Sequence, residues 1–218
     1  MSTTVFITGC SSGFGEAAAM LFSSRGWNVV ATVRKPDDGR RLTDLKNIRV
    51  LRLDAQDSNS IDKAIKDAIS HFGQIDLIVN NAGYGLFSLF EPASREAIQK
   101  QFDVNVFGTM DVIRAVLPHF RANRAGTIIN ISSGAGVFGA AMASIYCASK
   151  FALEGFSESL SYELADLGIK VKIVEPGAAP GTGFVARSQR EKDALPIPED
   201  YNAFIAHTVK VYGAMATN

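Results

Sequence analysis

A tyrosine and a lysine lie four residues apart in Tyr146-Cys147-Ala148-Ser149-Lys150. Side chains at this spacing share one face of a helix. A phenol has an ordinary pKa of about 10, too high for proton exchange near neutrality. An ammonium about 4 Å away contributes roughly 4 kcal/mol at an effective dielectric constant of about 20, or about three pH units. The pair therefore predicts a tyrosine acid/base whose pKa Lys150 draws toward pH 7.

Two polar residues upstream extend this candidate catalytic set. Ser133 ends a predicted strand in Ile131-Ser132-Ser133, at the edge where doubly wound sheets bind ligands. Its hydroxyl can donate a hydrogen bond to a substrate oxygen. Asn105 lies in the middle of a helical pattern, where asparagine fits poorly and a functional reason is expected. A tolerated interior asparagine is the alternative, and Ser132 is interpreted as structural.

A glycine-rich segment, Thr8-Gly9-Cys10-Ser11-Ser12-Gly13-Phe14-Gly15, joins the first predicted strand to the first helix. Glycines let a backbone approach a pyrophosphate, and a helix N-terminus supplies free N–H groups. No Gly-Lys-Ser/Thr follows, so a triphosphate-binding loop is not indicated. A ligand-free turn is the alternative. The candidate phosphate-binding residues are Gly9, Ser11, Ser12, Gly13, Phe14 and Gly15.

The elements that must position these residues alternate between short apolar runs and amphipathic runs. Strands are predicted at residues 5–7, 29–33, 48–53, 77–79, 127–131 and 169–174. A first helix should bury Phe14, Ala17, Ala18, Leu21 and Phe22; a second, capped by Ser58, should bury Ile61, Ile65, Ala68, Ile69 and Phe72. Further helices are expected at 94–123 (one or two, with Pro118 a kink or break), at 144–167 and at 201–215. Apolar strands separated by helices predict an α/β, doubly wound parallel sheet in a single domain, residues 1–218.

This combination resembles the short-chain dehydrogenase/reductase family. The shared features, in the family's order, are Thr-Gly-x3-Gly-x-Gly, Asn80-Asn81-Ala82-Gly83, Asn105, Ser133 thirteen residues before Tyr146, Lys150, and Pro176-Gly177. The resemblance covers about residues 4 to 177 and implies a Rossmann-like oxidoreductase, a carbonyl reductase or hydroxysteroid dehydrogenase. Tyr146 would protonate the alkoxide formed by hydride transfer. Lys150 would also hold the nicotinamide ribose, and Asn105 a water linking Lys150 to solvent.

The resemblance also extends the cofactor site and suggests an assembly. Further cofactor-binding residues are expected at Asn81, Ala82, Gly83, Pro176 and Gly177, besides Tyr146 and Lys150. Relatives commonly pair the helices that correspond to 94–123 and 144–167, which implies a homodimer or homotetramer. Two departures are expected: Thr182 comes one residue late for the family's nicotinamide-contacting threonine, and the family's last helix and strand are lacking.

The choice of cofactor depends on the end of the second strand. Val33 lies 18 residues after Gly15, near where an NAD-binding protein places an acid on the ribose 2′-hydroxyl. Valine cannot accept that bond, whereas Arg34 suits a 2′-phosphate, so NADP(H) is the predicted cofactor. Asp54 resembles the family's adenine-contacting acid, with a capping or loop aspartate as the alternative.

The predicted substrate is a small hydrophobic ketone or aldehyde and its alcohol. The expected pocket lining is apolar: Tyr84, Leu86, Phe87, Val137 and Phe138. The Gly- and Pro-rich residues 178–200 are interpreted as a substrate loop that orders over the pocket. A non-enzymatic NADP(H)-binding regulator is the alternative function, although such proteins typically lose the tyrosine or the lysine. An epimerase or dehydratase would usually carry a larger C-terminal domain.

Composition excludes several other classes of protein. Lysine plus arginine equals aspartate plus glutamate, 22 each, which argues against nucleic acid as a partner. No apolar run approaches the roughly 18 residues of a membrane span. The two cysteines, with no leader-like N-terminus, suggest a cytoplasmic protein with reduced thiols. His71, His119 and His207 form no motif, so no metal site is expected.

Overall fold

A six-stranded parallel sheet forms the centre of the protein. The computed structural model describes residues 2–177, 184, 188 and 197–216, and side chains as far as residue 211. The strand order is β3-β2-β1-β4-β5-β6, with every neighbouring pair parallel. The strands are β1 Thr4–Ile7, β2 Asn28–Val33, β3 Ile48–Arg52, β4 Leu77–Asn80, β5 Gly126–Ile131 and β6 Ile169–Val174. The predicted doubly wound, Rossmann-like sheet is confirmed, and its order reverses between β1 and β4, where such folds bind ligands.

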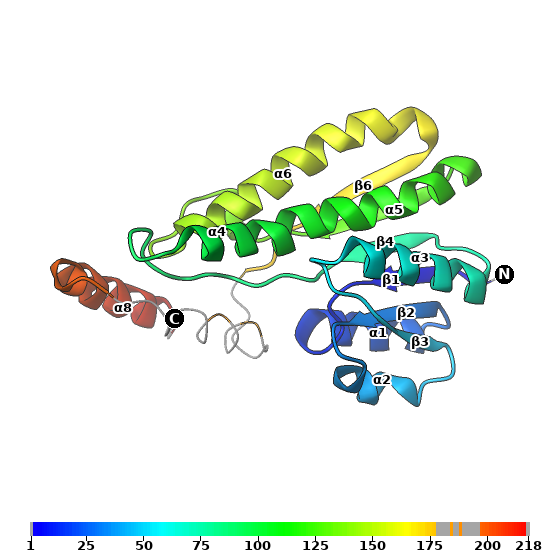
Figure 1. Ribbon diagram of the computed structural model, residues 1–218, viewed down its shortest axis with the longest axis horizontal. Coiled ribbons are helices and arrows are strands. Elements are labelled where there is room, and N and C mark those ends of the chain that lie inside the picture. The colour runs from blue at the N-terminus through cyan, green and yellow to red at the C-terminus, as the bar shows by residue number, and fades with distance from the viewer. Residues whose placement is uncertain (1, 178–183, 185–187, 189–196, 217–218) are drawn as a thin grey trace.

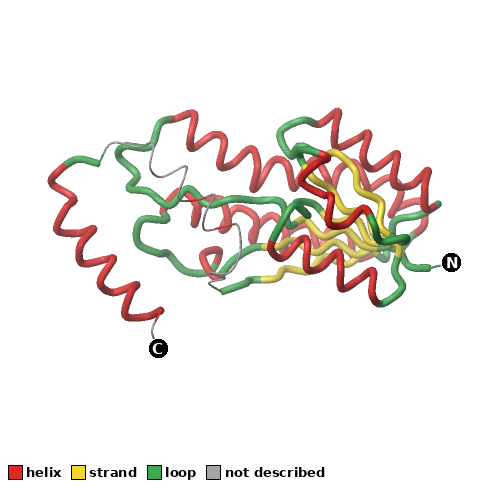
Figure 2. Tube along the Cα trace, turned by 90° about the horizontal axis from the view of Figure 1, so that it is seen from below, coloured by secondary structure: helices red, strands yellow, loops and turns green. Residues whose placement is uncertain are grey.

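Helices cover both faces of the sheet (Figures 1 and 2). The α-helices are α1 Gly13–Ser24, α2 Arg40–Thr43, α3 Ser58–Phe72, α4 Arg95–Phe102, α5 Gly108–Asn123, α6 Ser144–Leu164 and α8 Asn202–Ala216. A π-helical turn, η2 Asp103–Phe107, joins α4 to α5. Single 3-10 turns occupy η1 Pro36–Gly39, η3 Gly134–Gly136, η4 Ala165–Leu167 and η5 Glu199–Tyr201.

Two hydrophobic cores lie on opposite faces of the sheet because successive strand side chains alternate between its faces. Phe6, Val30, Ile78 and Ile128 pack against α3, α5 and α6. On the other face, strand residues pack against α1 and α2; they are Val5, Ile7, Val29, Ala31, Val33 and Val79. The carboxyl ends of all six strands therefore meet at one rigid edge, as the site requires.

The predicted buried face of α1 is only partly confirmed. Ala18 and Phe22 pack against the core, but Phe14, Ala17 and Leu21 are exposed, and Gly15 and Ala19 are buried instead. A Cβ on Gly15 would lie 2.4 Å from the Gly9 carbonyl oxygen, so only a small residue permits this approach. Gly15 and Ala19 therefore face the sheet, together with Ala18 and Phe22 of the predicted face.

Two predictions about helix boundaries are also corrected. Asp57 caps α3 in place of Ser58, its carboxylate accepting a hydrogen bond from the Ser60 N–H at 3.1 Å. The predicted buried face of that helix is confirmed at Ile61, Ile65 and Ala68. Pro118 does not break α5. It lies on the exposed side, where water can bond the carbonyl that proline leaves unpaired, and the irregularity falls instead in the π-helical turn.

After β6, the described chain resumes at residue 197 and forms η5 and α8, which project beyond the carboxyl edge of the sheet in Figure 1. The helix predicted at 201–215 is confirmed, and Thr208 on its predicted face is buried while Phe204 and Val209 are exposed. Residues 178–183, 185–187 and 189–196 of the predicted substrate loop, with Thr182, lie outside the described residues. Over the part of the chain that the structure describes, no strand follows β6.

A buried hydrogen-bonded chain connects β4, β5 and α6. Asn80 Nδ2 donates to Asn130 Oδ1 at 2.8 Å, and Asn130 Nδ2 donates to Ser157 Oγ at 2.8 Å. All three side chains are buried. Removing the middle member leaves polar groups unpaired in the core, at a cost of about 1–3 kcal/mol for each.

We therefore predict that Asn130→Ala lowers the free energy of unfolding by about 2 kcal/mol or more, measured by urea denaturation. Asn59→Ala, on the exposed surface of α3, is the control and should change it by about 0.5 kcal/mol at most. Equal urea midpoints for Asn130→Ala and the wild type would show that the hydrogen bonds between Asn80, Asn130 and Ser157 contribute nothing to stability.

Candidate active site

The glycine turn lies between the carboxyl end of β1 and the N-terminus of α1. Gly9 and Gly13 have φ angles of 73° and 63°, in the left-handed region that favours glycine. Ser12 precedes α1 in an extended conformation, and its side chain makes no capping hydrogen bond. The first turn of α1 is thus left without a side-chain cap, as expected for an anion-binding helix end.

Hydrogen bonds fix this turn to the end of β4. Thr8 Oγ1 accepts the backbone N–H groups of Asn81 and Ala82, both at 2.9 Å. Asn81 Nδ2 donates back to the carbonyls of Thr8 at 2.9 Å and Gly9 at 3.1 Å. A Cβ on Gly9 would come within 2.9 Å of Ala82 Cα. The predicted binding segments around Gly9 and Asn81–Gly83 therefore form one continuous wall.

A shallow depression lies beside this wall, between the strand ends and the start of α5. Its lining residues are Thr8, Leu53, Ala55, Asn80, Ala82, Val104, Gly108, Thr109 and Val112. Asp54, expected to contact adenine, lies between two of them and accepts the Gln56 N–H at 3.2 Å. This hydrogen bond within the loop is consistent with the alternative that Asp54 is a loop residue. Its contact with adenine stays a prediction.

Tyr146 and Lys150 lie together on α6, each with only 6% of its surface exposed. Lys150 Nζ is 5.9 Å from the centroid of the Tyr146 ring and donates to the Ile131 carbonyl at 2.8 Å. Burial lowers the pKa of Lys150 to about 8, an effect that Glu154 opposes. The ammonium is therefore the main form below pH 8 and is lost above it.

The pKa of Tyr146 differs from the sequence-based expectation. Burial raises it above its ordinary value, while a hydrogen bond with Ser133 acts in the opposite direction. In the protein alone, the effect of burial on this pKa is the largest one. Tyr146 is consequently a neutral phenol at physiological pH.

Ser133 completes this group from the end of β5. It begins the η3 turn, and its Oγ accepts the Ala135 N–H at 3.2 Å. The same side chain lies close enough to Tyr146 to lower the pKa of its phenol. Two hydroxyl groups thus lie together at the carboxyl edge of the sheet, where both can bond one substrate oxygen, as the sequence predicts.

Asn105 is buried in the π-helical turn, and its amide is taken by protein groups. Its Oδ1 accepts the Tyr84 N–H at 3.1 Å, and its Nδ2 donates to the Tyr84 carbonyl at 2.9 Å and to Ser149 Oγ at 3.2 Å. The wide turn explains how asparagine fits inside a helical run. The side chain holds the segment after β4 against α6; its role with a water stays a prediction.

Gln101 has a similar positioning role that the sequence analysis missed. Its Oε1 accepts the Leu86 N–H at 2.7 Å, its Nε2 donates to the Tyr84 carbonyl at 2.8 Å, and its side chain is fully buried. A second amide four residues before Asn105 on the same helical run was the available signal. The two amides together fix the backbone of residues 84–86.

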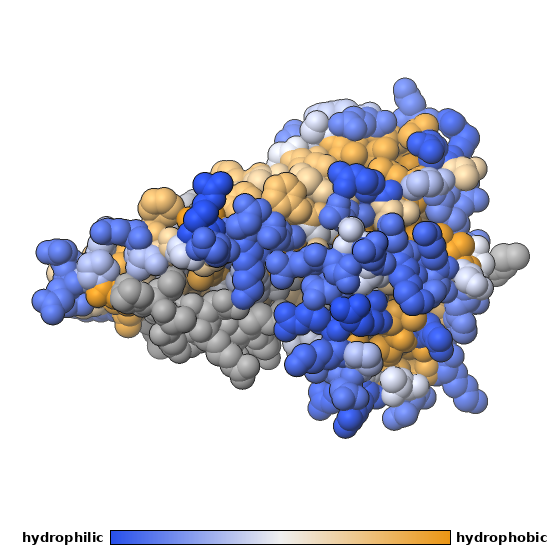
Figure 3. Space-filling model, in the orientation of Figure 1, coloured by the Kyte–Doolittle hydropathy of each residue, from blue (hydrophilic) through white to orange (hydrophobic). Residues whose placement is uncertain are grey.

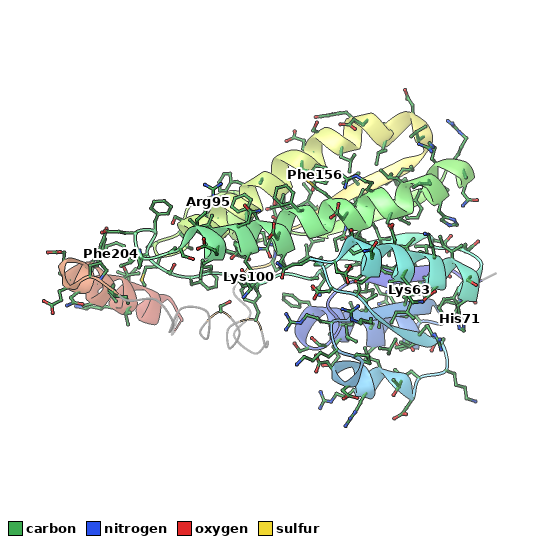
Figure 4. All side chains as sticks on the ribbon, in the orientation of Figure 1. Lys63, His71, Arg95, Lys100, Phe156 and Phe204 are labelled. Carbon is green, nitrogen blue, oxygen red and sulfur yellow. The ribbon has the colours of Figure 1, made fainter. Side chains whose placement is uncertain are left out.

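The apolar lining is only partly as predicted. Tyr84 and Leu86 pack with Ile145 in a small core of their own, because their backbone is drawn toward α4. Phe87 lies against Tyr146, with ring centroids 5.1 Å apart, and Phe184 packs on both rings. Val137 and Phe138 are exposed. Phe87 and Phe184 thus pack on the ring of the candidate proton donor. Figure 4 shows the described side chains, with Lys100 on α4 and Phe156 on α6 labelled, and Figure 3 shows the hydropathy of the same face.

The remaining predicted residues lie along the same edge. Val33 is 1% exposed and packs in the second core, whereas Arg34 is exposed at the end of β2. The Pro176 carbonyl accepts the Gly134 N–H at 3.2 Å, which places Pro176 and the exposed Gly177 beside the η3 turn.

The cysteines and histidines of the described residues form no metal-binding cluster. Burial raises the pKa of Cys10 to about 12, so its thiol is unreactive. His119 Nε2 accepts the Ile75 N–H at 3.2 Å. Within the described ranges, no three metal-binding side chains gather at one point, and none of the helices combines the length and apolarity of a membrane span.

Comparisons with known proteins agree with this geometry. A family profile described as short chain dehydrogenase matches residues 3–193. The chain belongs to this family, the short-chain dehydrogenases/reductases. It is 42% identical over 180 residues to the 3-ketodihydrosphingosine reductase of Bacteroides thetaiotaomicron, covering 83% of this chain and 65% of the reductase. The chain thus spans less than two thirds of that relative's length.

Solved structures show the same fold. A serine dehydrogenase in its closed form with NADP+ superposes with a TM-score of 0.83 and 32% identity, covering 88% of this chain and 78% of the dehydrogenase. A 3-ketoacyl-(acyl-carrier-protein) reductase from Brucella melitensis with NADH gives a TM-score of 0.82 and 29% identity, covering 88% of this chain and 81% of the reductase. The fold therefore occurs with either nicotinamide cofactor.

The link between Thr8 and β4 can be tested directly. We predict that Thr8→Val, which keeps the shape but loses the acceptor, lowers the free energy of unfolding by about 1–3 kcal/mol, because two backbone N–H groups lose their partner. Thr8→Ser keeps the hydroxyl and should retain most of the wild-type stability. Equal urea midpoints for the valine and serine variants would contradict this assignment.

Proposed function

We propose that the protein is an NADP(H)-dependent oxidoreductase that interconverts a hydrophobic ketone or aldehyde and the corresponding alcohol. The observation that supports it most is the proximity of the Ser133 and Tyr146 hydroxyl groups, with Lys150 one helical turn along α6 from the tyrosine. This group lies at the same sheet edge as the glycine turn, the expected seat of the cofactor pyrophosphate.

The proposed mechanism assigns each side chain one task. The cofactor, when bound, supplies or accepts the hydride. Ser133 donates a hydrogen bond to the substrate oxygen, and Tyr146 gives its phenolic proton to that oxygen as negative charge develops. A neutral phenol suits this reduction direction. In oxidation, Lys150 and a cationic nicotinamide would together stabilise the phenolate.

The candidate cofactor residues fit an extended dinucleotide. The glycine turn from Gly9 to Gly15 would hold the pyrophosphate, and Asn81–Gly83 would border the adjacent ribose. Lys150 would bond the nicotinamide ribose, near Pro176 and Gly177. Asn105 and Gln101 would act by positioning the segment after β4, since both side chains bond its backbone.

The proposed substrate class rests on the apolar surroundings of Tyr146. Phe87 and Phe184 pack on the ring of Tyr146. Val137 and Phe138, four and five residues after Ser133, are exposed to solvent. The name of the Bacteroides relative, a 3-ketodihydrosphingosine reductase, denotes a ketone substrate with a hydrocarbon chain. A carbonyl compound with an apolar substituent is therefore the favoured class.

We also propose a homodimer or homotetramer. Phe107 on the π-helical turn and Phe151 on α6 are both about half exposed, and large exposed aromatic side chains favour burial in an interface. Sedimentation analysis would measure the oligomeric state.

The acid/base assignment predicts that Tyr146→Phe binds NADPH but loses nearly all carbonyl reduction. The change removes one hydroxyl and little volume, so the fold should persist. Tyr162→Phe, on the same helix but 74% exposed, is the matched control and should keep wild-type turnover. The measurement is NADPH oxidation against a panel of ketones and aldehydes.

Substantial turnover by Tyr146→Phe would remove Tyr146 from the mechanism. If the wild type binds NADPH but reduces none of the ketones and aldehydes in the panel, the alternative of a non-enzymatic NADP(H)-binding regulator would be favoured.

The cofactor assignment predicts that the wild type binds NADPH more tightly than NADH. A charge-assisted hydrogen bond from Arg34 to the 2′-phosphate is worth roughly 1.5–3 kcal/mol, or about 10- to 150-fold in affinity. Arg34→Ala should remove most of this preference without changing NADH binding. Because Val33 is buried, a new acid there would disturb the core, so the single arginine variant is the cleaner test.

Arg25→Ala, at the far end of α1, is the control for the loss of one positive charge. The dissociation constants of both cofactors at fixed salt decide the outcome. Equal affinities of the wild type for NADPH and NADH would return Arg34 to the role of a solvated surface charge.

A further inference from the structure

A carboxylate that the proposed mechanism does not use lies one helical turn beyond Lys150. Glu154 follows Lys150 by four residues on α6, so the two side chains share a helix face. Its Oε1 is buried and has no hydrogen-bond partner among the described residues. A buried carboxylate oxygen without a partner is costly, which calls for an explanation of its placement.

The surroundings of Glu154 hold it in place. A Cβ on Gly136 would lie 2.9 Å from Glu154 Oε1 and 2.8 Å from Ser132 Oγ. Ser132 Oγ is also buried without a partner. The carboxylate and this hydroxyl therefore approach the same side of the η3 turn, in space left open because residue 136 has no side chain.

Glu154 is the charged residue that acts on the buried ammonium. Its negative charge raises the pKa of Lys150 against the larger, opposite effect of burial. The described elements packed against α6 are α4, η2, η3, η4 and β6. Their charged side chains, none of which contributes to that pKa, are Arg95, Glu96, Lys100, Asp103, Asp166, Lys170 and Lys172.

We propose that Glu154 is a positioning residue for the Tyr146–Lys150 pair: its buried carboxylate, one helical turn from Lys150 and beside Gly136 and Ser132, supplies the negative charge that balances the buried ammonium. This inference rests on the proposed function only for its effect on catalysis. The effect on the lysine itself is a property of the protein without any substrate.

The consequence for catalysis follows from the sign of the charge. Lys150 is protonated below about pH 8 in the wild type. Without the negative charge of Glu154, its proton leaves at lower pH, so a larger fraction of the amine is neutral near pH 7 to 8. A neutral amine stabilises neither a phenolate at Tyr146 nor negative charge on the substrate oxygen. The alkaline limb of the carbonyl reduction rate should therefore move to lower pH.

The test measures the pKa of Lys150 by NMR, from the ¹³Cε shift of labelled lysine, in the wild type, E154Q and E158Q. Glu158 lies one turn farther along α6 and is exposed, so E158Q controls for the loss of one negative charge. We expect E154Q to lower the pKa by about one pH unit or more, and E158Q to leave it within a few tenths. E154D, which keeps the charge, should recover most of the loss.

A second measurement uses the wild type alone and does not depend on the folding of any variant. Ionisation of Lys150 should produce an inflection in the Glu154 carboxyl ¹³C shift at the same pH, because the coupling between two charges is mutual. Equal Lys150 pKa values in the wild type and E154Q, or no such inflection, would overturn the proposal.

The NADPH oxidation rate as a function of pH separates this inference from the proposed function. A shift of the alkaline limb in E154Q equal to the shift in the Lys150 pKa would support both. A shifted lysine in a protein that reduces no carbonyl would support the role of Glu154 and contradict the proposed function. Activity with an unshifted lysine would support the function and contradict the role of Glu154.

Discussion

The hydrogen bonds between Thr8 and the start of the Asn81–Gly83 segment hold together the two strands on which the site depends. β1 and β4 are neighbours in the sheet, but the chain leaves them in opposite directions, so a crevice opens between their connections. One hydroxyl accepts two backbone N–H groups there, and one amide returns two hydrogen bonds. Both walls of the crevice are thereby fixed before any ligand arrives, which lowers the ordering cost of binding.

The second constraint is the burial of an ammonium beside a phenol. Each group alone would lose hydration, and burial moves their pKa values in opposite senses, the lysine down and the tyrosine up. The Ile131 carbonyl and the distant carboxylate of Glu154 compensate the lysine in part. Burying these two ionisable groups lowers the stability of the fold. Such costs are common at functional sites, where side chains are placed for chemistry and not for packing.

The fold was largely predictable because its signals are local and repeated. Six apolar runs between helical patterns sufficed for a parallel sheet, and the strand bounds differ from the prediction by one residue at most. The face of α1 was not predictable from periodicity, since the approach of Gly15 to Gly9 depends on tertiary contact. Pro118 misled for a similar reason: its cost depends on exposure, which a sequence does not state.

The site was predictable where motif spacing carried it and not where contacts across the fold decide. Tyr146, Lys150 and Ser133 come together as their spacing indicates. Tyr84 and Leu86 were assigned to the pocket by composition alone, but buried amides draw their backbone toward α4. The spacing of Glu154 from Lys150 was visible in the sequence, but its burial beside Gly136 was not, because that depends on a missing side chain in another element.

The π-helical turn at Asp103–Phe107 has a consequence for the evolution of chain length in this region. Such a turn holds one more residue than an α-helical turn, so losing any single residue from it would produce one continuous α-helix. Four α-helical residues turn through nearly the same angle as the five residues of the wide turn, so α4 and α5 would keep their relative facing. The deletion would instead remove the bulge from which the Asn105 side chain reaches the Tyr84 backbone and Ser149. A one-residue deletion, harmless to helix formation itself, would thus release the segment after β4 from α6. Insertions and deletions should therefore be tolerated far less here than in the exposed connections of the same chain.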